Sequence, residues 1–248
     1  MDKRDAWLVA CDIDGTLLLP ETGNHGLEEF NRFIAERRDH VVFALNSGRS
    51  LADIASVADS GPIARPNWVI TGVGTALWSD FSPESLDTGW DDEMNRPWQR
   101  AEIRESLMGC PCLREQEENH QHPARLSYYI DGPVSEVLPE VSWRTAQWEA
   151  SVKRVVTLGY YLDFMPSWGG KGAPLVYLAE RLGIAHDRVI AAGDSGNDRD
   201  MLDRDYPSIV VANHASDLDD IVGKPGVYLS REPGARGVLE GMRHFGLE

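Results

Sequence analysis

Residues 7–16 read Trp7-Leu8-Val9-Ala10-Cys11-Asp12-Ile13-Asp14-Gly15-Thr16, an apolar run followed at once by two carboxylates. The apolar run predicts a buried β-strand, and the carboxylates come where the backbone leaves the sheet. Because side chains repeat every second residue along a strand, we expect Asp12 and Asp14 to face one cavity. Like charges this close are unfavourable unless a cation or a shared proton lies between them. The stretch therefore predicts a ligand site at the end of the first strand.

The composition of the chain excludes several classes of partner. Its 248 residues are 42% hydrophobic and 26% charged, as in ordinary globular proteins with a substantial core. A formal net charge of −16 repels nucleic-acid phosphates and anionic membranes, so we expect neither as a partner. No apolar run approaches the roughly 20 residues that span a bilayer, and the charged start at 1–5 lacks the apolar core of a signal peptide. We expect a cytoplasmic protein, and a monomer or weak dimer.

Strand and helix signals alternate through the first 80 residues. Short continuous apolar runs alternate with helical periodicity, as expected when parallel strands are buried on both faces and helices cover them. This alternation indicates an α/β fold with a doubly wound, mostly parallel sheet. The strands predicted after the first are 41–45 and 68–71, and the predicted helices are 27–38 and 51–58.

The pattern changes near residue 81, and the α/β alternation returns only at Lys171. We therefore expect a core domain, residues 1–80 and 167–248, that is interrupted by an α+β insert, residues 81–166. In the insert, the predicted helices are 100–108 and 134–150, and the predicted strands are 126–130, 154–158 and 160–164. After it come predicted strands at 188–192, 208–212 and 227–229, and a last helix at 235–245.

Polar residues follow the predicted strands, at the edge where open parallel sheets bind their ligands. Asp12 and Asp194 each end a strand, and with the backbone carbonyl of Asp14 they offer the oxygen ligands that Mg²⁺ prefers. The hydroxyl of Ser47, backbone N–H groups of the turns and the ammonium of Lys171 can hold phosphate oxygens. The sequence therefore predicts a site for phosphoryl transfer.

Each of these residues also has a purely structural interpretation. The Asp pair can form a turn or a helix cap, Ser47 can cap the next helix, and Lys171 can be a solvated lysine before a helix. Residues 194–198 can be a plain helix N-terminus or a loose calcium loop, although the later Glu of an EF-hand is missing. Gly72-Val73-Gly74 lacks the third glycine of a dinucleotide fingerprint, so we expect a tight turn there.

Four segments resemble, in the same order, the four motifs of the haloacid dehalogenase superfamily of phosphatases. The family pattern is DxDGT, then Ser or Thr after a strand, then Lys, then GDxxND. The insert between the second and third motifs resembles the type II cap of that superfamily. The matching segments are Asp12-Ile13-Asp14-Gly15-Thr16, Ser47, Lys171 and Gly193-Asp194-Ser195-Gly196-Asn197-Asp198.

Outside the motifs, residues 67–75, 162–166 and 237–246 are similar to the sucrose-phosphatase subfamily, which includes mannosylfructose-phosphate phosphatase. The chain departs from this subfamily at two positions. Sucrose-phosphatases often carry Asn where this chain has Gly15, and Asn or Asp where it has Gly170. The resemblance covers nearly the whole core and parts of the insert.

The resemblance implies Mg²⁺-dependent hydrolysis of a sugar phosphate, with a disaccharide phosphate such as sucrose 6-phosphate as substrate. Asp12 would attack phosphorus and form an aspartyl-phosphate, while Asp14 donates and then accepts a proton. The metal would be held by Asp12, the Asp14 carbonyl and Asp194, and Lys171 would stabilise the developing charge. We expect the phosphate and substrate contacts to come from Ser47, Gly48, Arg49, Lys171 and Asn197, and the supporting positions to be Asp198 and Ser195.

Other functions stay open at this point. The same site suits mannosylfructose phosphate, a broader phosphatase of sugar or nucleotide phosphates, or a phosphotransferase. A phosphorylation-driven signalling module would combine similar acidic, hydroxyl and lysine residues. Asp14 argues against a signalling module, because it supplies the base that hydrolyses an aspartyl-phosphate.

Overall fold

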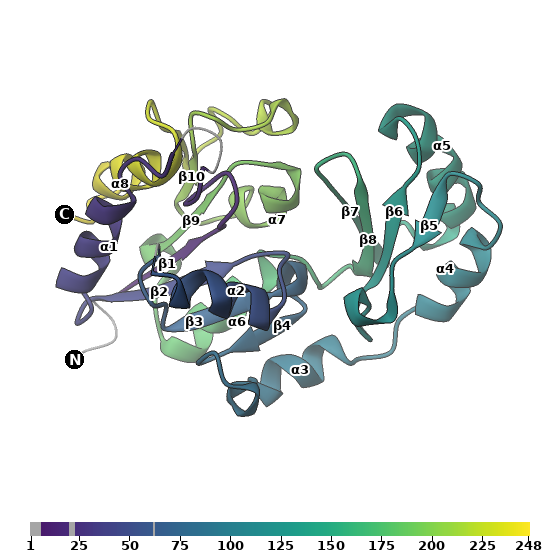
Figure 1. The fold of residues 1–248 in the computed structure, drawn as a ribbon, viewed down its shortest axis with the longest axis horizontal. Helices are drawn as coiled ribbons and strands as arrows, with labels where there is room; N and C mark the ends of the chain where they lie inside the picture. Colours follow the sequence, from purple (N-terminus) through teal and green to yellow (C-terminus); the bar gives the residue numbers. More distant parts are fainter. Residues whose placement is uncertain (1–5, 20–22, 62) are drawn as a thin grey trace.

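The computed structural model describes residues 6–19, 23–61 and 63–248. The charged start at 1–5 and residues 20–22 of the polar loop after the first strand lie outside this part of the chain. Within it, the chain forms two separate β-sheets, the first from both ends of the sequence and the second from its middle. Figure 1 shows the two sheets side by side, with the C-terminus on the side of the first. No helix in the described ranges is long and apolar enough to cross a membrane.

Strand β1 (Trp7–Cys11) lies at the centre of the first sheet and pairs in parallel with β2 (Val41–Asn46) and β9 (Val189–Gly193). Because Cys11 pairs with Leu45 on one side and with Ala192 on the other, the three strands end at one edge. The predicted doubly wound, mostly parallel α/β sheet is confirmed. The described strand order is β11-β10-β9-β1-β2-β3-β4, with β3 at Trp68–Thr71, antiparallel β4 at Ala76–Trp78, β10 at Ser208–Val210 and β11 at Val227–Leu229.

Helices cover both faces of this sheet. Val9 and Cys11 of β1 belong to the apolar cluster under α1, α2 and α8, whereas Leu8 and Ala10 belong to the cluster under α3, α6 and α7. This double burial explains why the strand is a continuous apolar run. The bounds are α1 Leu27–Glu36, α2 Leu51–Asp59, α3 Thr88–Met94, α6 Ala173–Leu182, α7 Arg199–Leu202 and α8 Gly234–His244.

The second sheet is antiparallel and has the order β5-β6-β8-β7. One face packs against α4 and α5, as Figure 1 shows, through side chains such as Ile103, Val141 and Leu162. The hairpin predicted around Gly159 is present, and both Leu158 and Gly159 take the positive φ of a tight turn. The bounds are α4 Arg100–Leu107, β5 Leu113–Glu115, β6 Leu126–Ile130, α5 Val134–Thr145, β7 Val152–Thr157 and β8 Tyr161–Pro166.

Among the described strands and α-helices, four short elements were not predicted from the sequence: β4, β5, α3 and α7. The two strands have three residues each, which is too short to show a period. Helix α3 lies within the range predicted for the insert, yet Trp90 and Met94 are buried in the first sheet's cluster. The Trp90 indole N–H also donates to the Gly74 carbonyl at 3.1 Å. The division at residues 81 and 166 stays a prediction.

Candidate active site

The ends of β1, β2 and β9 bring Asp12, Ser47 and Asp194 to one edge of the first sheet. Each residue directly follows its strand. The parallel register continues one residue further, because the Asp12 N–H donates to the Ala192 carbonyl at 3.0 Å. Asp12 and Ser47 are buried, and Asp194 is partly buried. The structure therefore brings together three segments that are far apart in the chain.

Lys171 lies between two carboxylates at this edge. Its Nζ donates to Asp12 Oδ1 and to Asp198 Oδ1, both at 2.6 Å, and its side chain is fully buried. Burial acts against the charged ammonium, but the attraction of the two carboxylates outweighs it and raises the pKa of Lys171 above its usual value. The lysine therefore stays charged and offsets part of the negative charge around it.

The carboxylates of Asp12, Asp194 and Asp198 form an acidic cluster, in which one oxygen atom of each lies within 4.8 Å of the others. Burial, together with the charge of Asp198, raises the pKa of Asp194 to about 7. Burial also raises the pKa of Asp12, although Lys171 opposes this. Three carboxylates facing one ammonium leave excess negative charge, and oxygen donors suit hard cations. The residues therefore fit a divalent metal ion.

Asp14 lies in a different environment from Asp12. Its side chain is 50% exposed, and its two carboxylate oxygens accept from Nε and Nη2 of Arg49, both at 2.7 Å. The acidic cluster is formed with Asp198 and does not include the Asp14 carboxylate. Asp12 and Asp14 therefore differ in exposure and in their partners, and the expectation that both face one cavity stays a prediction. The chain turns directly after Asp12, since the Leu17 N–H donates to the Ile13 carbonyl, so the strand period no longer applies.

The predicted phosphate-binding loop, Ser47 to Arg49, is held by the neighbouring turn at Gly72–Gly74. The Gly72 N–H donates to the Arg49 carbonyl at 3.1 Å, and the Val73 N–H donates to the Ser47 carbonyl at 3.2 Å. The Ser47 hydroxyl accepts from the Arg49 N–H at 3.3 Å. The tight turn predicted at Gly72–Gly74 is confirmed as a 3₁₀ turn. Its backbone supports the loop next to Asp12.

The loop after β9 is organised by Asp198. Its Oδ2 accepts from the backbone N–H groups of Asp194 and Ser195, at 3.0 and 3.2 Å, while its Oδ1 accepts from Lys171. The Ser195 hydroxyl donates to Asn197 Oδ1 at 3.1 Å. A single buried carboxylate therefore shapes the loop and orients the lysine.

Three further residues at this edge were not assigned from the sequence. The Thr16 hydroxyl donates to Asp194 Oδ1 at 2.8 Å, and Asn46 Nδ2 donates to the Lys171 carbonyl at the same distance. Asn213 Nδ2 donates to the Gly15 carbonyl at 2.7 Å. Thr16 is the last residue of the first motif and Asn46 directly precedes Ser47, so their positions were a usable signal. Asn213 lies three residues beyond the end of β10, and its contact with Gly15 joins segments that are 198 residues apart in the chain.

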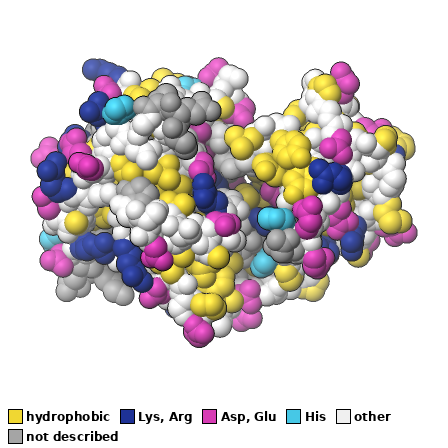
Figure 2. All heavy atoms as spheres, in the orientation of Figure 1, with side chains coloured by type: hydrophobic (Ala, Val, Ile, Leu, Met, Phe, Trp, Pro, Cys, Tyr) yellow, Lys and Arg dark blue, Asp and Glu magenta, His cyan; other side chains and the backbone are white. Residues whose placement is uncertain are grey.

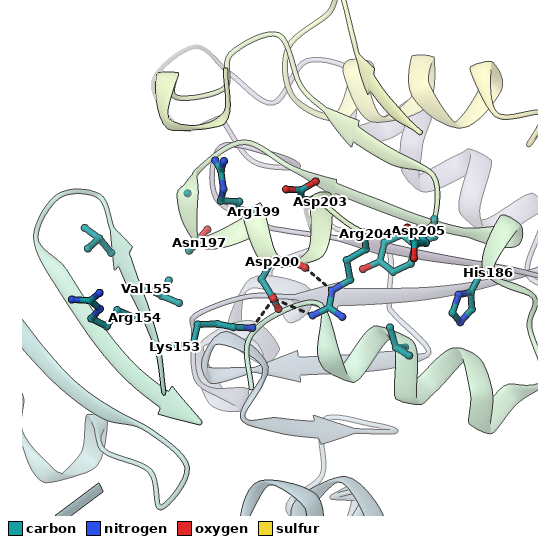
Figure 3. A pocket seen from close by; sticks show the side chains of 14 residues that line it. Lys153, Arg154, Val155, His186, Asn197, Arg199, Asp200, Asp203, Arg204 and Asp205 are labelled. Atoms are coloured by element: carbon teal, nitrogen blue, oxygen red, sulfur yellow. Dashed lines mark hydrogen bonds and ion pairs between the residues drawn. The ribbon is translucent and has the colours of Figure 1, made fainter. Parts of the chain in front are cut away.

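A cavity of about 700 Å³ lies beside this edge, between β7 of the second sheet and the segments around α7. Asn197 borders it, together with Lys153, Asp200 and Arg204, as Figure 3 shows. Asp12 and Lys171 do not line it. In the space-filling view of Figure 2, the surface is notched between the two parts of the molecule. The candidate site therefore lies where the second sheet approaches the first.

Comparison with known proteins gives a family for this chain. The family model described as sucrose-6F-phosphate phosphohydrolase matches residues 5–246. The mannosylfructose-phosphate phosphatase of Agrobacterium fabrum is 28% identical over 244 residues, which are 97% of each chain. Sucrose-phosphatase 1 of Nicotiana tabacum is 28% identical over 252 residues, but the match spans only 59% of that longer protein.

The fold is also shared with a solved structure. The sucrose-phosphatase of Synechocystis sp., solved in complex with sucrose and phosphate, superposes with a TM-score of 0.86 over 98% of both chains at 24% identity. At that identity the likeness concerns the fold alone. The family model matches nearly the whole sequence, and this match is the stronger evidence for the family of the chain. The chain belongs to the sucrose-6F-phosphate phosphohydrolase family, a family of phosphatases.

Proposed function

We propose that this protein hydrolyses the phosphate ester of a sugar, with a disaccharide phosphate such as sucrose 6-phosphate as its substrate. Family membership and the two named relatives support the reaction class. One observation carries the assignment to this site. The buried Asp12 carboxylate lies at a strand end, 2.6 Å from a buried lysine and within the acidic cluster. This arrangement supplies a nucleophile, a cationic partner for phosphate and a place for a metal.

Asp12 is the proposed nucleophile. Its free carboxylate oxygen attacks phosphorus, the ester P–O bond breaks, and the phosphoryl group is carried as an aspartyl-phosphate until water hydrolyses it. Lys171 already contacts Asp12, so the same ammonium can bind the phosphate oxygens in the transition state. Ser47, the Gly48 backbone and Asn197 are proposed to complete the phosphate contacts.

Asp14 is proposed to carry the proton. It protonates the departing sugar oxygen and then accepts a proton from the hydrolytic water. Both of its carboxylate oxygens accept from Arg49, so this pair must open before Asp14 can donate a proton. A substrate phosphate competes with Asp14 for the Arg49 guanidinium, because Arg binds phosphate in the same bidentate manner. Once released from Arg49, the exposed Asp14 carboxylate can take up a proton from water and pass it to the departing sugar oxygen.

The proposed metal is Mg²⁺, held by Asp12, Asp194 and the backbone carbonyl of Asp14. All of these donors are oxygen atoms, which is the set that Mg²⁺ prefers. When bound, the ion supplies positive charge that offsets the repulsion between the carboxylate and the phosphate. Asp198 and Ser195 support the site through the hydrogen bonds of the loop after β9. The insert, residues 81–166, is proposed to act as a cap that encloses the sugar.

Phosphate release from a panel of substrates tests this proposal. The panel contains sucrose 6-phosphate, mannosylfructose phosphate, hexose phosphates and nucleotides, each with Mg²⁺. We expect Asp12→Asn to lower kcat by at least about 10³-fold, because it removes the nucleophile. The exposed Asp59 serves as the matched control, and Asp59→Asn should match the wild type.

The panel also separates the candidate substrates. A kcat/KM highest for sucrose 6-phosphate supports the proposed substrate. A kcat/KM highest for mannosylfructose phosphate would instead indicate the substrate for which the relative from Agrobacterium fabrum is named, a protein that this chain matches over 97% of its length. Comparable values across monosaccharide, disaccharide and nucleotide phosphates would indicate a broad phosphatase. Activity retained in Asp12→Asn would contradict the proposed site.

A further inference from the structure

Lys153, on β7 of the second sheet, reaches across to the first. Its Nζ donates to Asp200 Oδ1 on α7 and to the Gly169 carbonyl, both at 2.6 Å. Figure 3 shows this side chain pointing at Asp200 from the opposite side of the cavity. The two side chains are 24% and 19% exposed, so water screens the pair only in part. The contact joins the two sheets beside the candidate site.

Asp200 also bonds to the segment that carries Lys171. Its Oδ2 accepts from the Gly172 N–H at 2.8 Å, while its Oδ1 is shared between Lys153 and Arg204 Nη2, the latter at 3.0 Å. Arg204 lies four residues further along the chain, beyond the end of α7, and also donates from Nε to the Asp200 carbonyl at 2.7 Å. The carboxylate is therefore held from three sides. Lys153 holds the Gly169 carbonyl and Asp200 holds the Gly172 N–H, so the segment that carries Lys171 is held on both sides of the lysine. These two contacts, joined by the Lys153–Asp200 pair, are called the bracket below.

The bracketed segment, Gly169 to Gly172, has little room to move. Gly170 has φ +99°, and a Cβ there would lie 2.6 Å from Asp200 Oδ2 and 2.9 Å from Lys153 Nζ. A Cβ on Gly74 would lie 2.2 Å from the Gly170 carbonyl oxygen. The Lys171 carbonyl is itself held by Asn46. The Lys171 backbone is thus positioned by Asn46, Gly74, Asp200 and Lys153.

The same segment connects the two sheets in the chain. Strand β8 ends at Pro166, and α6 of the first sheet begins at Ala173. A shift of the β7–β8 hairpin against the first sheet would therefore act on Gly169–Gly172 twice. It would act through the chain itself and through Lys153.

We infer that Asp200 is a positioning residue for Lys171, and that Lys153 makes this positioning depend on where the β7–β8 hairpin lies. When the hairpin lies against the first sheet, Lys153 completes the bracket and the ammonium of Lys171 is directed at Asp12. When the hairpin moves away, the bracket loses one side. The inference rests on the proposed function of Lys171 as a phosphate-binding residue.

Kinetics of Lys153→Met, Asp200→Asn and the double variant, assayed with Mg²⁺ and the best substrate of the panel, test the inference. Lys224→Met is the matched control, since Lys224 also pairs with an aspartate near α7, Asp203, at 2.7 Å, but among the described residues its side chain makes no hydrogen bond or ion pair with β7 or Gly169–Gly172. We expect Lys153→Met to lower kcat about tenfold with less than about a threefold change in KM, because a small displacement of a catalytic group weakens transition-state contacts. The double variant should be no slower than Asp200→Asn, because both act through one bracket.

Hydrogen exchange provides a readout apart from activity. The Gly172 amide should exchange about tenfold faster in Lys153→Met than in the wild type. In Lys224→Met its exchange rate should equal that of the wild type. Equal kcat in Lys153→Met and Lys224→Met, multiplicative losses in the double variant, or unchanged exchange at Gly172 would each overturn the inference. Lys171→Met separates the two proposals. If it stays active, the proposed function of Lys171 fails; if it is inactive while Lys153→Met matches its control, only the bracket fails.

Discussion

Charge is placed in opposite ways in two regions of this molecule. At the edge of the first sheet, Lys171 is fully buried and bonds to two buried carboxylates. Beside the second sheet, Arg104 pairs with Glu115 at 2.9 Å, but the two side chains are 51% and 29% exposed. A surface pair contributes at most about 1 kcal/mol, whereas a buried charge that loses its partner costs several. The two regions therefore differ in how much stability the loss of one charge should cost.

The largest effect should come from Lys171→Met in the metal-free protein. The substitution leaves Asp12 and Asp198 buried without their cation, so we expect the free energy of unfolding to fall by about 3–5 kcal/mol. Urea denaturation measures the loss. Arg104→Met is the control from the other region, and it should cost no more than about 1 kcal/mol. Similar losses in the two variants would remove the difference between the regions.

Gly15→Ala should lower the stability less than Lys171→Met does. The loss should be larger at Gly15, beside the acidic cluster, than for the same substitution at Gly109, in the region of the second sheet. Gly15 has φ +84°, and a Cβ there would lie 2.3 Å from Asp194 Oδ2. We expect a loss of about 1–3 kcal/mol in stability and weaker metal binding, because Asp194 must move. Gly109 has φ +72° with no atom near the added Cβ, so Gly109→Ala measures the backbone strain alone, about 1 kcal/mol. Denaturation and metal titration of both variants show whether the contact with Asp194 matters; equal losses and unchanged metal affinity would show that it does not.

The pH dependence of metal binding should give the smallest of these effects. The pKa of Asp194 is raised to about 7, chiefly by burial, and a metal ligand must lose its proton before it binds. We therefore expect Mg²⁺ affinity to rise about tenfold between pH 6 and pH 8. In the metal-free protein, the contribution of Asp194 to the free energy of unfolding changes with pH in the opposite direction, falling as the pH rises. The folded state holds more protons than the unfolded state between about pH 4 and 7, so this group lowers the stability as the pH rises through that window.

Calorimetric titration at pH 6, 7 and 8 measures the affinity. Asp194→Asn is the control, because it has no carboxyl group to titrate at this position. The Mg²⁺ affinity of Asp194→Asn should be weaker than that of the wild type and should depend much less on pH. An equally steep pH dependence in the variant would assign the titration to another group of the cluster.

The site residues that could be predicted from the sequence are those that a local pattern marks, a polar residue directly after a predicted strand. Asp12, Ser47 and Asp194 come directly after strands that read as continuous apolar runs. Asn213 and Asp200 contact partners 198 and 28 residues away in the chain, Gly15 and Gly172, and no local period connects them. Helix α3 was missed for a related reason, because its buried face is defined by packing against the first sheet.

The mostly parallel sheet and the meeting of the motif segments at one edge of it could be predicted from apolar runs and the polar residues that follow them, since both are properties of a short stretch of chain. The order of the strands could not. The difference between Asp12 and Asp14 could not be predicted either. The two carboxylates are two residues apart and chemically identical, yet one is buried against Lys171 and Asp198, and the other is half exposed on Arg49. Burial and charged neighbours set the properties of a carboxylate, and both come from segments that only folding brings together.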